Sequence, residues 1–107
     1  MKPTLLSLPC LIAFSGFFTT ALPALAQDAS TGTVVMVAGD PGDFVTQLDV
    51  NGRCGSPYFH SQRANANFKE MVAVALTAFT TGRRMTFFVT GCAGDRNITS
   101  HGYVTRD

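Results

Sequence analysis

One segment of helical periodicity stands among segments that alternate like β-strands, and this contrast restricts the folds open to the chain. From Phe68 onward, apolar residues recur at intervals of three and four, which predicts an amphipathic helix of about 14 residues. The stripe expected to face the core consists of Phe68, Met71, Val72, Ala75, Leu76 and Phe79. Asn67 can cap the start of this helix, with Glu70 at a favoured position, and Gly82 can provide its left-handed end.

Five other segments have the composition or the alternation of strands. They span residues 31–38, 44–50, around 58–60, 83–90 and 98–105. Asn51-Gly52 is a hairpin signal between the second and third of them. The resulting order, β-β-β-α-β-β, is that of a five-stranded OB-fold barrel. We therefore expect a mainly β domain with one helix, folded as an OB-fold-like barrel.

The N-terminal segment has the features of a secretory signal peptide. Lys2 precedes an apolar stretch over residues 5–18, and Ala24-Leu25-Ala26 supplies a small-x-small cleavage site. The stretch is shorter than the roughly 20 residues of a membrane helix. We expect residues 1–26 to be removed, so that residues 27–107 form a single secreted or periplasmic domain.

The charge of that domain is balanced. The eight basic residues of the chain, less Lys2, equal its seven acidic residues. A neutral domain lacks the long-range field that attracts phosphate backbones. Nucleic acid is therefore not an expected partner.

The cysteines also fit export. Removal of Cys10 with the leader leaves Cys54 and Cys92, and thiols oxidise in exported proteins. We expect one disulfide, worth roughly 3 to 4 kcal/mol of stability. A metal or redox site would need closer spacing or more ligands, and we expect no metal or cofactor.

Several short motifs between residues 57 and 88 point to one family. They are Pro57-Tyr58-Phe59, Phe68, Ala75-Leu76, Phe79-Thr80-Thr81-Gly82 and the strand that begins at Arg83. With these motifs, and with Thr31-Gly32-Thr33-Val34-Val35 as a first strand, the chain resembles the B subunit of subtilase cytotoxin and its relatives. These are the cell-binding pentamers of a class of AB5 toxins. The chain departs from them at His60, where those subunits have a cysteine, and in a shorter segment after the fourth strand.

This resemblance implies an OB-fold subunit, a ring of five with the helices lining a channel, and recognition of sialylated glycans. It implies glycan contacts at Ser30 and Thr31, and a catalytic toxin subunit as a partner. The chain also resembles short exported bacterial barrels without a toxin partner, in which a pair such as Cys54-Gly55 recurs with one such as Gly91-Cys92.

The second face of the predicted helix carries few charges. Ala73, Val74 and Thr77 lie there, whereas a solvated helix face usually has more charged residues. We expect these residues to form an interface between subunits of a homo-oligomer. A bare surface of small residues is the alternative.

Two polar groups remain as candidates for function. Asp95, Arg96 and Asn97 form the most polar cluster, on a predicted loop that is either a binding loop or a simple turn. His60 and His101 would have to converge on one cleft to act as the acid and base of a small hydrolase or nuclease. We expect a binding module without catalytic residues. The alternatives are an accessory or structural exported protein without a small ligand, and the hydrolase.

Overall fold

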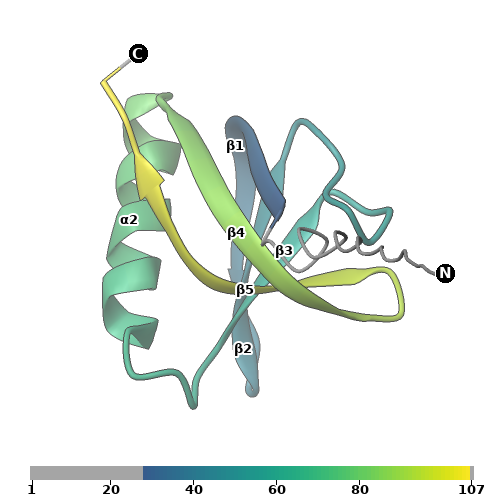
Figure 1. Ribbon diagram of the computed structural model, residues 1–107. Helices are drawn as coiled ribbons and strands as arrows, with labels where there is room; N and C mark the ends of the chain where they lie inside the picture. Colours follow the sequence, from purple (N-terminus) through teal and green to yellow (C-terminus); the bar gives the residue numbers. More distant parts are fainter. Residues whose placement is uncertain (1–27, 107) are drawn as a thin grey trace, which may run out of the picture.

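The computed structural model describes residues 28–106, in which five strands form a closed ring and one helix packs against it (Figure 1). The elements are β1 (Asp28–Gly39), β2 (Asp43–Leu48), β3 (Tyr58–Gln62), α2 (Phe68–Thr81), β4 (Arg84–Ala93) and β5 (Arg96–Val104). The prediction of a mainly β domain with one helix after the third strand is confirmed. The predicted signal peptide and its cleavage site lie outside the described residues.

The ring closes because β1 is long and changes partners along its length. Residues 28–33 pair with β4, and residues 34–39 pair with β2, with a register shift between Val34 and Met36. On the other side, β3 and β5 run parallel through short pairing at His60 and Ile98. The strand order is therefore β1-β2-β3-β5-β4, and each strand has two neighbours.

The core lies inside the ring and under the helix. The rings of Phe59 from β3 and Phe87 from β4 stack with their centroids 5.1 Å apart. Side chains alternate along β4, so Met85, Phe87 and Val89 are buried while Arg84 lies exposed on the opposite side. The buried cluster contains Val34, Leu48, Phe59, Met71, Ala75, Ala78, Met85, Phe87 and Val89.

The helix has the predicted length, but it is rotated relative to the predicted stripe. Met71, Ala75 and Ala78 are buried, whereas Leu76 and Phe79 are 41% and 44% exposed. The prediction that Leu76 and Phe79 face the core is therefore wrong. Phenylalanine and methionine side chains from the strands already fill the ring, and alanines allow the helix axis to approach that core closely.

The C-terminal end of α2 has the predicted conformation, whereas its N-terminal end lacks the predicted side-chain cap. Gly82 adopts the predicted left-handed conformation, with φ of 73°, and its N–H donates to the Ala78 carbonyl at 3.0 Å. Asn67 does not cap the helix with its side chain. Its amide instead donates to the Ser100 carbonyl at 3.0 Å, which ties the start of the helix to β5.

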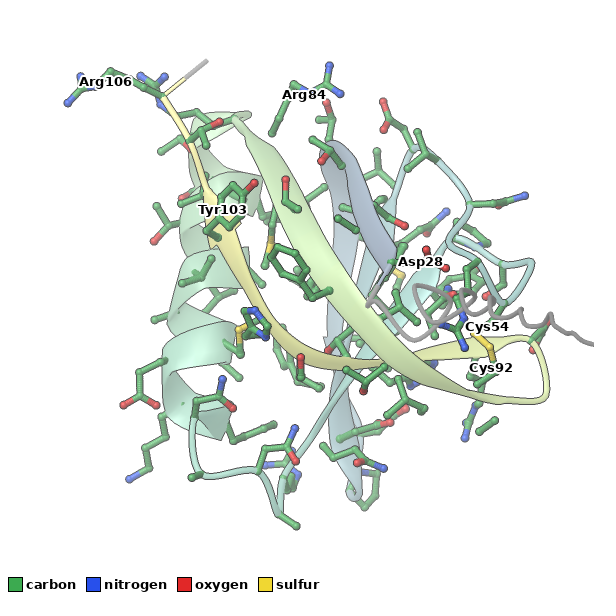
Figure 2. All side chains as sticks on the ribbon, in the orientation of Figure 1. Asp28, Cys54, Arg84, Cys92, Tyr103 and Arg106 are labelled. Carbon is green, nitrogen blue, oxygen red and sulfur yellow. A yellow bond between two sulfur atoms is a disulfide. The ribbon has the colours of Figure 1, made fainter. Side chains whose placement is uncertain are left out.

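The predicted disulfide between Cys54 and Cys92 is confirmed, with the two Cα atoms 5.6 Å apart. It joins the β2–β3 connection to β4, at the right of the view in Figure 2. Residues 49–57 form this connection, so the tight hairpin predicted at Asn51-Gly52 is replaced by a longer loop. Within residues 28–106, α2 falls short of the length and apolar character that a membrane crossing requires.

Candidate ligand-binding sites

Thr31 lines a surface pocket of about 530 Å³ on the outer side of three strands, which we call the Thr31 pocket. The strand register places Thr31 of β1 beside Thr86 of β4, and Thr86 beside Tyr103 of β5. The hydroxyl oxygens of Thr31 and Thr86 lie 2.7 Å apart and share a hydrogen bond. Arg84 and Thr105 complete the lining.

The Thr31 pocket also exposes an aromatic ring and a guanidinium. Tyr103 is 47% exposed, and Arg84 is exposed beside it. Figure 2 shows Arg84 and Arg106 at the top of the view, with Tyr103 below them on β5. The Phe88 ring lies 6.0 Å from that of Tyr103 and continues the aromatic surface along the sheet. Such a surface offers an apolar platform next to positive charge.

The two residues predicted as glycan contacts have different positions. Thr31 lines the pocket, as described above. Ser30 pairs with the inward-facing Phe87 and is half-buried. Since neighbouring residues of a strand face opposite sides, the Ser30 side chain does not line the pocket with Thr31.

A second pocket of about 430 Å³ lies over the other half of β1 and the strands β2 and β3. It opens between the turn joining β1 to β2 and the turn joining β4 to β5. We call it the Tyr58 pocket. Its lining residues are Met36, Ala38, Asp40, Val45, Ser56, Tyr58, His60, Asp95 and Arg96.

The two histidines lie in different surroundings. His60 lines the Tyr58 pocket, is only 6% exposed, and has its Nδ1 2.7 Å from a carboxylate oxygen of Asp43. His101 is exposed, stacks on Phe88 with ring centroids 4.4 Å apart, and shares a hydrogen bond of 2.7 Å with Ser100. In the described part of the chain, no contact joins the two imidazoles. The geometry therefore adds no support to the hydrolase hypothesis.

The polar cluster at 95–97 divides between a pocket and the core. Asp95 and Arg96 are exposed and line the Tyr58 pocket. Asn97 is buried within β5, so its placement on a loop was wrong. Its side chain donates to the carbonyl oxygens of Ser56 and Tyr58, each at 2.8 Å. Asn97 is therefore a structural residue behind the Tyr58 pocket.

The three residues of α2 that were predicted to form an interface differ in their exposure to solvent. Ala73 and Thr77 are exposed, whereas Val74 is half-buried and packs against the core. Leu76 and Phe79 are exposed beside them. The free surface of the helix is therefore more apolar than the sequence pattern indicated.

The sequence alone did not identify two residues that line the Thr31 pocket, Arg84 and Tyr103. Arg84 and Tyr103 both lie in segments predicted as strands, at positions where alternation would turn them outward. They meet Thr31 only through the register of β1, β4 and β5, which the pattern of a single strand does not reveal. The sequence also did not predict that Tyr58 and His60 line one pocket with the 94–95 turn.

Across residues 28–106 there is no group of three or more His, Cys, Asp or Glu side chains able to hold a metal ion. Comparisons of the chain with protein-family models, with curated proteins and with solved structures give no match. The fold and the pockets described here thus define the class only as a small disulfide-bonded β domain with concave surface sites.

Proposed function

We propose that the protein is an exported, non-catalytic binding module that recognises a sialylated cell-surface glycan. The observation that carries this proposal is the Thr31 pocket, because a residue proposed from the family resemblance lines it together with an exposed tyrosine and an arginine. Glycan sites commonly combine an aromatic platform with a few polar groups that fix orientation.

Each part of the Thr31 pocket has a role in this proposal. The guanidinium of Arg84 can bind the carboxylate of a sialic acid through two parallel hydrogen bonds. The exposed ring of Tyr103 can pack against the C–H groups of the sugar. The Thr31 and Thr86 hydroxyls share one hydrogen bond, which leaves one of the two O–H groups to donate to a sugar hydroxyl.

We assign the fold to the OB-fold class as part of the same proposal. Three features support the assignment: the strand order, the parallel pairing of β3 with β5, and the helix between β3 and β4. These are the features of the five-stranded barrel expected from the sequence.

We further propose that the module acts as a homo-oligomer, with a ring of five and a catalytic toxin subunit as the arrangement implied by the resemblance. The support comes from α2, where Leu76 and Phe79 stand exposed one turn apart with the half-buried Val72 before them. No charged residue occurs between Met71 and Gly82. Covering this face with another subunit would remove it from water.

A glycan array probed with labelled protein lacking residues 1–26 tests the function. We expect binding to sialylated glycans and loss of binding after sialidase treatment. Arg84→Ala should abolish binding, whereas Arg53→Ala, which changes an exposed arginine outside the pocket, should leave it unchanged. Absence of binding to every glycan would favour the accessory-protein alternative.

A further inference from the structure

We infer that the C-terminal end of α2 holds an anion site, which takes a phosphate monoester. The site is a pocket of about 330 Å³ between the end of α2 and the end of β5, which we call the Arg83 pocket. Its lining residues are Thr77, Thr81, Arg83, Val104, Thr105 and Arg106. The inference goes beyond the proposed function, because this pocket shares only Thr105 with the Thr31 pocket and contains different arginines.

Two separate segments bring an arginine to this pocket. Gly82 ends the helix, so Arg83 lies directly between α2 and β4. Arg106 follows the end of β5, and Figure 1 shows this end of the chain beside the C-terminal end of α2. The Thr105 N–H donates to the Arg84 carbonyl at 3.4 Å, which holds the end of β5 beside the start of β4. The backbone thus places both guanidinium groups at one pocket.

Both guanidinium groups are free. Arg83 and Arg106 are exposed, and neither makes an ion pair or a hydrogen bond with another residue of 28–106. None of the acidic residues in that part of the chain lines the pocket. Two unpaired positive charges therefore form a local excess in a domain that is expected to be neutral as a whole. Such an excess attracts an anion.

An alternative role for these arginines is to pair with the carbonyl groups at the end of the helix. Threonine hydroxyls already bind those carbonyl groups. The Thr81 hydroxyl donates to the Thr77 carbonyl at 2.6 Å. The Thr80 hydroxyl donates to the Leu76 carbonyl at 2.9 Å. The helix end therefore does not need the arginines, and their two full charges outweigh its roughly half negative charge.

The arrangement of the donors indicates the class of anion. The Thr77 hydroxyl lines the pocket and makes no hydrogen bond within residues 28–106. With Arg83 and Arg106, it provides donors from three segments of the chain. A phosphate monoester presents oxygens in several directions and carries nearly two negative charges at pH 7, whereas a carboxylate has two oxygens in one plane and a single charge. Val104 adds an apolar wall for the carbon skeleton of the ester.

The test is a titration of the isotope-labelled protein at constant ionic strength, followed by amide chemical shifts. The probes are inorganic phosphate and glucose 6-phosphate, with acetate as the comparison. We expect saturable shifts around Thr77, Arg83 and Thr105 with both phosphates and not with acetate. Arg83→Gln and Arg106→Gln should each weaken this binding about tenfold, because each removes charge-assisted hydrogen bonds.

The phosphate group can belong to a soluble molecule or to a lipid, and a second measurement separates these sources. It is cosedimentation with vesicles of phosphatidylcholine, with and without phosphatidic acid. Cosedimentation that requires phosphatidic acid and is displaced by glucose 6-phosphate would assign a lipid headgroup to the pocket. Binding of the soluble phosphates without cosedimentation would assign a soluble ligand. Both results support the inference.

Arg84→Gln is the matched control, since it removes the neighbouring exposed arginine, which lies outside the Arg83 pocket. It should change phosphate binding less than about twofold at near-physiological salt, where the field of a more distant charge is largely screened. Dispersed amide spectra of each variant establish that it is folded.

Four results would overturn the inference: no saturable shifts with either phosphate, equal shifts with acetate, binding that survives the combined change of Arg83 and Arg106, and vesicle binding without binding of a soluble phosphate. None of them affects the glycan-array test of the proposed function, because that test depends on Arg84.

Discussion

The side-chain oxygen of Asn97 accepts a hydrogen bond from the backbone N–H of Cys54 at 2.9 Å. The same side chain donates to two carbonyl groups further along the loop and in β3. One buried amide in β5 therefore holds residues 54–58, the second half of the β2–β3 connection, next to the disulfide. Gly52 packs so closely on this amide that a side chain there would collide with it.

Replacement of Asn97 by alanine should therefore destabilise the fold strongly. The change removes three hydrogen bonds and leaves buried backbone groups without partners, for an expected loss of about 2 to 4 kcal/mol in the free energy of unfolding. Urea denaturation of the oxidised protein measures this loss. Asn51→Ala, in an exposed part of the same loop, is the control and should cost less than about 0.5 kcal/mol. Equal stability of the two variants would contradict the structural role of Asn97.

The disulfide should make a separate contribution. Cys54 and Cys92 are 38 positions apart, and on the chain-entropy model such a loop is worth roughly 3 to 4 kcal/mol. A variant with both cysteines changed to serine should show that loss in chemical denaturation. In wild-type protein, the non-reduced mass should be two hydrogens below the reduced mass. Two alkylatable thiols in unreduced protein would refute the bond.

The rotation of α2 can be tested by comparing two neighbouring positions. Ala78 is fully buried, so Ala78→Leu should overpack the core and cost about 1 to 3 kcal/mol. Phe79 is nearly half exposed, so Phe79→Ala in dilute protein should cost less than about 1.5 kcal/mol. Thermal denaturation of both variants shows which of the two substitutions costs more stability. A larger loss of stability in Phe79→Ala than in Ala78→Leu would instead support the helix orientation that was predicted from the sequence.

The exposed apolar face of α2 should control association. Changing Leu76 and Phe79 together to glutamine removes the two large side chains without adding charge, and it should leave the monomer folded. Light scattering should show a multimer for the wild type and a monomer for the double variant. Lys69→Gln, at the exposed start of the helix, should not change the mass. A wild-type monomer at micromolar concentration would rule out the homo-oligomer.

The sequence predicted those features of the fold for which the local pattern of residues and the tertiary environment favour the same structure. The helix bounds, the left-handed Gly82 and the cysteine pair follow from spacing and composition alone. The face of the helix that is buried cannot be predicted in this way, because Leu76 and Ala78 both fit a helical stripe. Only the volume left by Phe59 and Phe87 in the core favours burial of the smaller residue. Asn97 looked like a turn residue because its buried partners are distant in sequence.

The sites were harder to predict than the elements. Thr31 was found through a resemblance, but its partners Arg84 and Tyr103 depend on the register of three strands, which no single strand encodes. The Tyr58 pocket requires the meeting of two turns with β3, and this follows only from closure of the ring.

The exchange of partners along β1 has a geometric consequence for ligands. Thr31 belongs to one pocket and Met36 to the other, and both residues lie on this one strand. At about 3.3 Å per residue, the strand separates them by roughly 17 Å along its axis. A single sugar ring bound in one pocket would therefore not reach the other, so any ligands of the two pockets would bind independently.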